Sequence, residues 1–202
     1  EGYMKLGSGS NAAGAALYLD NFTISADPES ADSELLIDTF ARGDVNLLGG
    51  NTGVFYGGSA ACEMAAGDGS LRLKWSIGDD GYAGYWSDLN GLSLHGTDSL
   101  KICFAEESSD EFRVGIRCGE TEKSVLAADF AEISESGEYS IVVPLTDLGF
   151  DGEDRADVVF ITALGTEGEI EITRISLTGS ARVYPERLSV FDQRGWGSFS
   201  DG

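Results

Sequence analysis

The sequence predicts an all-β fold, a β-sandwich or jelly roll of two antiparallel sheets with N- and C-terminal extensions. Stretches in which apolar and polar residues alternate recur along the chain, at a spacing of roughly 8–15 residues. The chain has 28 glycines and only three prolines, which suits short strands joined by tight turns. No amphipathic pattern is long enough for a helix of more than two or three turns.

Length and charge limit the possible functions. A chain of 202 residues buries roughly 70% of its unfolded surface and folds without disulfides or metals. The net charge of -22, from 35 acidic and 13 basic residues, repels nucleic-acid phosphates and anionic membranes but not a neutral polysaccharide. A generic acidic surface would explain most of this charge. No apolar run approaches 18 residues, so no membrane span is predicted.

The predicted strands divide the chain into three parts. Residues 1–33 form an N-terminal extension with one strand, which belongs to a preceding module or adds to the sandwich, and a linker. Residues 34–179 form the sandwich, and residues 180–202 form a C-terminal extension with one or two strands. The sequence starts abruptly without a signal peptide, as expected of a piece of a longer protein, so this absence says nothing about export.

The sandwich strands follow from alternation and turns, in chain order. A strand over 35–40 precedes a glycine-rich loop region over 41–59. Two strands over 99–107 and 111–119 are predicted to form a hairpin. The segment 124–133 is compatible with a strand or a brief helix. Further strands are expected within 62–66, 71–77, 82–89, 137–144, 156–164 and 167–179.

The stretch from 71 to 94 carries the functional signal. Its first half places Leu71, Leu73, Trp75 and Ile77 on one side of a strand. In its second half, Tyr82, Gly84, Trp86 and Asp88 share one face, and Ala83, Tyr85, Ser87 and Leu89 share the other. If Leu89 points into the core, Tyr82 and Trp86 form a flat aromatic surface beside carboxylates, on which a sugar ring can stack. The alternative is that Tyr85 and Trp86 simply fill a large core.

The cysteines favour free thiols. There are three, Cys62, Cys103 and Cys118, and no CxxC motif, so a zinc site is unexpected. Alternation places Cys103 and Cys118 on opposite faces of neighbouring strands, which argues against a disulfide bond between them.

Residues 35–179 resemble jelly-roll carbohydrate-binding modules of the galactose-binding-like type, above all the family 11 modules of bacterial glycoside hydrolases. Three stretches carry the resemblance: LLIDTFARGDVNLLGGNTGVFYG near the start, the hairpin-like GSLRLKWSIGDDGYAGYW, and the closing EIEITRISLTG. The three stretches share the order and spacing of the family's motifs.

The resemblance implies a secreted, extracellular, non-catalytic module that targets an appended glycoside hydrolase to plant or algal β-glycans, either xylan or β-glucan. It implies stacking by Tyr82, Tyr85 and Trp86, and hydrogen bonding by Asp80, Asp88 and Arg72. Lys74 and Arg113 lie on the non-core faces of their strands and are further candidates for the groove.

The resemblance also suggests a structural calcium ion near the first and last strands. Asp38, Asp44 and Glu171 supply hard oxygen donors in suitable places. Because the chain has 35 acidic residues, such a match also arises easily by chance.

Catalytic motifs are sparse. The single histidine, His95, has no GxSxG motif or cysteine partner in its neighbourhood. Paired carboxylates for glycoside hydrolysis are not excluded, because acidic residues are so numerous. We therefore interpret the chain as a binding module. The alternatives are a structural sandwich that acts as a spacer in a multi-modular extracellular protein, with Tyr82 and Trp86 against a neighbouring module, and a small jelly-roll glycoside hydrolase or lyase.

Overall fold

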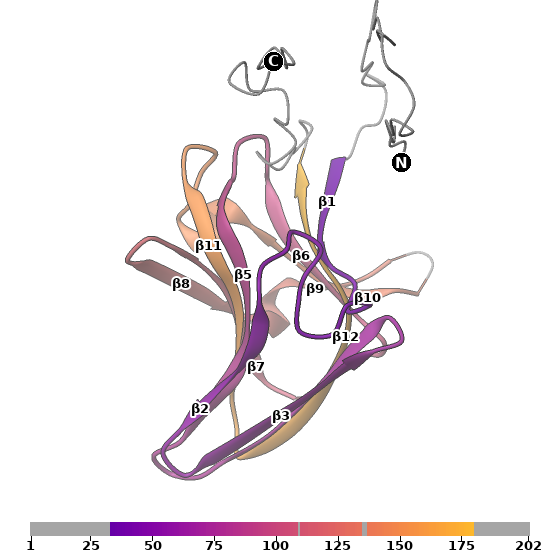
Figure 1. The fold of residues 1–202 in the computed structure, drawn as a ribbon, viewed down its shortest axis with the longest axis vertical. Helices are drawn as coiled ribbons and strands as arrows, with labels where there is room; N and C mark the ends of the chain where they lie inside the picture. Colours follow the sequence, from indigo (N-terminus) through magenta and orange to yellow (C-terminus); the bar gives the residue numbers. More distant parts are fainter. Residues whose placement is uncertain (1–32, 109, 135–136, 180–202) are drawn as a thin grey trace, which may run out of the picture. The chain divides into compact units, whose positions relative to one another are not determined.

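The predicted sandwich of two antiparallel sheets is confirmed. The computed structural model describes residues 33–108, 110–134 and 137–179, and Figure 1 shows its two sheets facing each other. One sheet has seven strands, in the order β3-β4-β12-β6-β10-β9, with β1 also paired to β12. The other has five strands, in the order β2-β5-β11-β7-β8.

The seven-stranded sheet contains β1 (Ser33–Asp38), β3 (Ala60–Gly67), β4 (Ser70–Ile77), β6 (Ser99–Phe104), β9 (Ala131–Ile133), β10 (Tyr139–Pro144) and β12 (Glu167–Gly179). The five-stranded sheet contains β2 (Thr52–Gly57), β5 (Tyr82–Ser93), β7 (Phe112–Cys118), β8 (Thr121–Leu126) and β11 (Arg155–Ala163). Two short 3-10 helices, η1 (Ala127–Phe130) and η2 (Leu145–Leu148), follow β8 and β10.

The core lies between the sheets and follows the predicted alternation. On β4, the inward side chains of Leu71, Leu73 and Trp75 are buried, while those between them are exposed. On β5, Tyr85 and Leu89 are buried with Ala83 and Ser87. Tyr82 and Trp86 therefore point away from the core, as the alternation predicted.

The predicted hairpin of 99–107 and 111–119 is wrong, and so is the hairpin that the family resemblance implied for the stretch GSLRLKWSIGDDGYAGYW. β4 and β5 lie in opposite sheets, and so do β6 and β7. In each case the chain crosses the sandwich instead of folding back within one sheet. Alternation identifies the inward face of a half-buried strand. It does not show whether the turn that follows leads to a strand in the same sheet or to one in the opposite sheet.

The region predicted as a loop over 41–59 contains an edge strand, β2, which pairs with β5. The segment 124–133 divides into the end of β8, η1 and β9, so both a strand and a brief helix are present. Cys62, Cys103 and Cys118 are free thiols, as expected.

The strand expected within residues 1–32 and those expected within residues 180–202 lie outside the described residues, and the three-part division stays a prediction. No helix in the described part of the chain is long and apolar enough to cross a membrane.

Candidate functional site

The candidate site is a groove of about 680 Å³ on the outer face of the five-stranded sheet. Side chains from β2, β5, β7, β8 and β11 line it: Phe55, Tyr82, Trp86, Asp88, Arg117, Glu122, Val158, Phe160 and Thr162. We call these nine residues the aromatic groove. Tyr82, Trp86 and Asp88, three of the six predicted ligand-binding residues, lie in it.

Each aromatic ring of the aromatic groove lies over a glycine of the neighbouring strand. A Cβ atom built on Gly53 would be 3.1 Å from Nε1 of Trp86, and one on Gly57 would be 2.6 Å from Cζ of Tyr82. In the same way, Gly84 lies beneath the Phe55 ring and Gly115 beneath Phe160. Because the glycines have no side chains, the rings can lie down on the sheet.

The strand register produces this arrangement. β2 and β5 are antiparallel, and their outer faces carry opposite patterns of glycine and aromatic residues. The register pairs Gly53 with Trp86, Phe55 with Gly84, and Gly57 with Tyr82. Across the next strands, Phe160 on β11 pairs with both Trp86 and Gly115.

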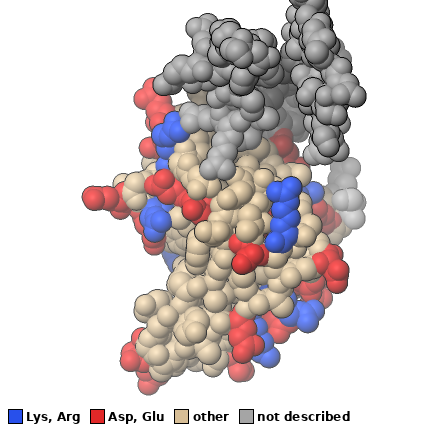
Figure 2. Space-filling model, in the orientation of Figure 1, with Lys and Arg blue, Asp and Glu red and all other residues tan. Residues whose placement is uncertain are grey.

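The rings differ in how much of their surface is free. Tyr82 is 56% exposed, Phe55 and Trp86 are half-buried, and Phe160 is only 7% exposed. Phe55 and Tyr82 have ring centroids 6.4 Å apart and planes inclined by 33°. The aromatic groove thus offers ring faces that are slightly tilted relative to one another. In Figure 2, a broad area without charged side chains covers the part of the domain formed by β2 and β3.

Polar side chains form the other end of the aromatic groove. The register places Asp88 and Arg117 on either side of Val158, and Arg117 opposite Glu122. Oδ1 of Asp88 accepts a hydrogen bond of 2.9 Å from the backbone N–H of Asn90. This end therefore offers carboxylate acceptors and a guanidinium donor, whereas the Tyr82 end offers ring faces.

A buried asparagine fixes the loop next to Asp88. The side-chain nitrogen of Asn46 donates to Oγ of Ser87 at 2.8 Å and to the carbonyl oxygen of Asp88 at 2.7 Å. Its side-chain oxygen accepts from the backbone N–H groups of Leu48 and Gly50. Asn46 is fully buried, so it holds the loop rigidly against the polar end of the aromatic groove.

Tyr85 is not a stacking residue, which corrects the sequence-based expectation. Its side chain has no exposed surface, and its ring packs edge-on against Phe40 with centroids 6.4 Å apart and planes at 70°. Burial raises the pKa of its hydroxyl far above the ordinary value. The alternation itself explains the position, because Tyr85 shares the core face of β5 with Ala83 and Leu89.

Arg72 also lies elsewhere, on the outer face of the seven-stranded sheet. Its Nε is 3.2 Å from Oε1 of Glu169, and its Nη2 is 3.2 Å from Oε2 of Glu171. Because β4 and β5 belong to opposite sheets, the side chains that β4 directs outward cannot reach the aromatic groove. Lys74 lies on β4 as well, beside a shallow hollow of about 220 Å³ lined by Ala61 and Glu63.

Asp80 lies in the turn between β4 and β5 and does not line the aromatic groove. Its carboxylate accepts hydrogen bonds from the hydroxyl and the backbone N–H of Ser59, which lower its pKa below the ordinary value. Asp80 therefore ties this turn to the one between β2 and β3. Arg113, on β7, donates to the hydroxyl and carbonyl oxygens of Ser124 at 2.9 and 2.6 Å.

The three predicted calcium ligands do not form a cluster. Asp38 is buried, and its Oδ1 accepts from the backbone N–H of Phe40 at 2.7 Å. Burial raises the pKa of Asp38 despite this bond. Glu171 accepts from Ser70 and Arg72, and Asp44 is exposed. Within residues 33–108, 110–134 and 137–179, no group of three or more His, Cys, Asp or Glu side chains is arranged to hold a metal ion.

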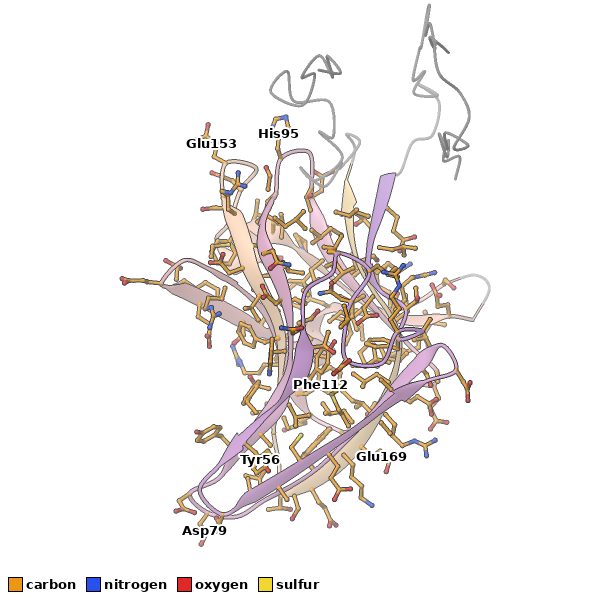
Figure 3. All side chains as sticks on the ribbon, in the orientation of Figure 1. Tyr56, Asp79, His95, Phe112, Glu153 and Glu169 are labelled. Carbon is orange, nitrogen blue, oxygen red and sulfur yellow. The ribbon has the colours of Figure 1, made fainter. Side chains whose placement is uncertain are left out.

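His95 lies in an exposed turn between β5 and β6. Figure 3 shows it beside Glu153 at the end of the domain opposite Asp79. It does not line the aromatic groove.

The sequence-based interpretation missed six lining residues: Phe55, Arg117, Glu122, Val158, Phe160 and Thr162. A signal for Phe55 was present, because Gly53, Phe55 and Gly57 alternate in the complementary way to Tyr82, Gly84 and Trp86. The residues of β7, β8 and β11 carried no comparable local signal, since only the strand order brings them beside β5.

Comparisons with solved structures find the same fold in carbohydrate-binding modules and in an enzyme. No protein-family model and no curated protein sequence matches the chain. The family 11 carbohydrate-binding module of a cellulosomal cellulase from Clostridium thermocellum matches with a TM-score of 0.51 and 16% identity, over 73% of this chain and 95% of that one. A family 11 module from Clostridium thermocellum in complex with a β-1,3-1,4-mixed-linked tetrasaccharide matches with a TM-score of 0.50 and 16% identity, over 74% and 97%.

An enzyme shares the fold as well. The β-1,2-glucanase of Parabacteroides distasonis matches with a TM-score of 0.51 and 14% identity, over 72% of this chain but only 25% of its own. At these identities, the likeness establishes a common fold.

Proposed function

We propose that this domain is a non-catalytic module that binds a single β-glycan chain in the aromatic groove, with xylan and β-glucan as the candidate ligands. The observation that carries the proposal is the set of rings laid flat over glycines, with Tyr82 and Trp86 presenting ring faces to solvent. The apolar C–H face of a pyranose fits such a ring. One ring that covers about 100 Å² of sugar contributes roughly 2.5 kcal/mol before ordering costs.

The polar end of the aromatic groove supports the same proposal. Asp88, Arg117 and Glu122 offer acceptors and a donor for sugar hydroxyl groups. A groove with hydrogen-bonding groups at one end and inclined rings at the other suits one chain in solution better than a flat crystalline surface. The net charge of -22 favours a neutral glycan over an acidic one.

The structural likeness adds support, since one of the matching modules is in complex with a mixed-linked tetrasaccharide. By extension, we propose an extracellular setting and an appended glycoside hydrolase that the domain brings to its substrate. A structural calcium ion stays a proposal without assigned ligands, because Asp38, Asp44 and Glu171 do not cluster in the described residues. It has a simple test: the melting temperature should rise on addition of calcium and fall again with a chelator.

Affinity electrophoresis against xylan, mixed-linkage glucan, xyloglucan, mannan and laminarin tests the proposal. Retardation by one polysaccharide, without release of reducing sugar, is the expected result. Absence of retardation by all of them, with folded protein, would instead make the aromatic groove an interface with a neighbouring module. Release of reducing sugar would identify an enzyme.

A further inference from the structure

Two glycines of β2 differ from the other glycines beneath the rings of the aromatic groove. The three atoms nearest to a Cβ atom on Gly53 would all belong to the Trp86 side chain, with Nε1 at 3.1 Å and Cε2 at 3.3 Å. The three atoms nearest to a Cβ atom on Gly57 would all belong to the Tyr82 side chain, with the hydroxyl oxygen at 2.5 Å and Cζ at 2.6 Å. Neither glycine has a positive φ angle, so the backbone at both positions accepts alanine.

The glycines of the inner strands are different. A Cβ atom on Gly84 would collide with the carbonyl oxygen of Ile161 as well as with the Phe55 ring, and one on Gly115 would collide with the carbonyl oxygen of Lys123. Substitutions there push strands apart. At Gly57 an added methyl group would have to displace the Tyr82 ring, and at Gly53 the Trp86 ring would have to yield by a few tenths of an ångström, whereas none of the nearest atoms at either position belongs to the backbone.

From this difference, we propose that Gly53 and Gly57 are positioning residues of the aromatic groove, which act through Trp86 and Tyr82. Each keeps the ring opposite it flat against the sheet, and together they set the tilt at which ring faces meet a glycan. That the ligand is a glycan rests on the proposed function, whereas the positioning of the rings by the two glycines does not.

Ring tilt decides which ligands fit, because stacking requires the sugar face and the ring face to be parallel along the whole contact. Phe55 and Tyr82 already differ by 33° in plane, so a chain that contacts both must turn between them. Raising Tyr82 changes this angle. We therefore expect Gly57→Ala to weaken the binding of a long oligosaccharide, which spans both rings, more than the binding of a short one that contacts Trp86 alone.

The experiment compares Gly53→Ala and Gly57→Ala with Gly67→Ala. Gly67 lies at the end of β3 in the other sheet and has no positive φ angle, and a Cβ atom added there would meet no atom within 4 Å. It is therefore a matched control for the glycine-to-alanine change itself. All variants are made in a Trp196→Phe background, which removes the third of the three tryptophans of the chain, a residue outside the described part. Because Trp75 is only 2% exposed, acrylamide quenching of fluorescence then reports mainly on Trp86.

For Gly53→Ala we expect stronger quenching of Trp86 than in the parent. For the oligosaccharide that the parent binds best, Gly53→Ala and Gly57→Ala should raise Kd roughly five- to tenfold, because part of a ring contact is lost. For both variants the melting temperature should stay within a few degrees of that of Gly67→Ala.

Unchanged quenching in Gly53→Ala together with an unchanged Kd in both variants would overturn the inference. So would a fall in melting temperature well beyond that of the control, which would show that these glycines serve strand packing. If the parent binds no glycan but Gly53→Ala still exposes Trp86, the proposed function fails and the positioning role of Gly53 stands.

Discussion

Inward and outward side chains alternate along the strands of both sheets, but the outward side chains of the two sheets differ in kind. The outer face of the seven-stranded sheet is covered with paired charges. Arg174 contacts Glu34 and Glu138 at 3.3 and 3.0 Å, and Lys101 contacts Glu138 at 3.3 Å. The outer face of the five-stranded sheet has the aromatic groove, with rings over glycines and polar groups at one end.

On the proposed function, the difference means that the sandwich reserves one face for its ligand. On the seven-stranded sheet, donors and acceptors are largely satisfied by one another, so a sugar hydroxyl would have to displace an ion pair. On the five-stranded sheet, the rings and the outward polar groups remain accessible to a ligand. The predictions that follow test this division, from the largest expected effect to the smallest.

The largest effect should come from a tryptophan that belongs to neither outer face. Trp75 is buried, and its Nε1 donates to the carbonyl oxygen of Leu164 at 3.2 Å. Trp75→Ala should lower the free energy of unfolding by about 3–5 kcal/mol, as measured by urea denaturation. A loss below about 1 kcal/mol would show that the core tolerates removal of this ring.

The groove tryptophan should behave in the opposite way. Trp86→Ala removes a ring contact of roughly 2.5 kcal/mol, so Kd for a bound glycan should rise roughly 70-fold by isothermal titration calorimetry. The melting temperature should stay within a few degrees. Tyr56→Ala is the matched control, because Tyr56 is 55% exposed and does not line the aromatic groove. A large loss of stability in Trp86→Ala would mark this ring as part of the core.

The two arginines sharpen the comparison between the faces. Arg117 lines the polar end of the aromatic groove, whereas Arg72 is paired with Glu169 and Glu171 on the other sheet. Arg117→Ala should raise Kd about tenfold, since a hydrogen bond from a charged donor is lost. Arg72→Ala should leave Kd unchanged. Equal effects in the two variants would contradict the assignment of the ligand to one face.

The smallest effect should be a pH dependence of stability carried by the seven-stranded sheet. Burial raises the pKa of Glu138, but the hydrogen bond from Lys101 and the charge of Arg174 outweigh it, so this pKa lies below its ordinary value. Glu138 therefore stabilises the fold above the pKa of an unfolded glutamate, and this contribution is lost as pH falls through the lower folded pKa. Glu138→Gln should flatten the fall of melting temperature with acidification. An unchanged slope would show that the ion pairs of Glu138 contribute nothing to the pH dependence of stability.

The sequence predicted the parts of the fold that depend on local patterns. Alternation identified the inward side chains of β4 and the outward positions of Tyr82 and Trp86, because the strand period of two residues is purely local. It could not tell which sheet a strand joins. Arg72 was therefore predicted to share a site with Tyr82 and Trp86, although these two residues lie on the opposite sheet. Phe160 and Arg117 were missed for the same reason, since pairing between β11, β5 and β7 joins distant segments.

The position of β12 has a consequence for the order in which the domain can be assembled. This strand pairs with β4 through its first half, with β1 through its second half, and with β6 on its other side. Residues 167–179 thus supply the pairing partner of β1 and the second partner of β4 and of β6, which also pair with β3 and β10. On a ribosome, β1 and one edge each of β4 and β6 must wait for nearly the whole sandwich to be synthesised. Contacts between such distant segments also slow the search for the native state, so we expect folding on the millisecond-to-second scale of β-sandwiches. A nascent chain that stalls before residue 167 would expose unpaired strand edges, which makes chaperone contact or aggregation the characteristic failure of this fold.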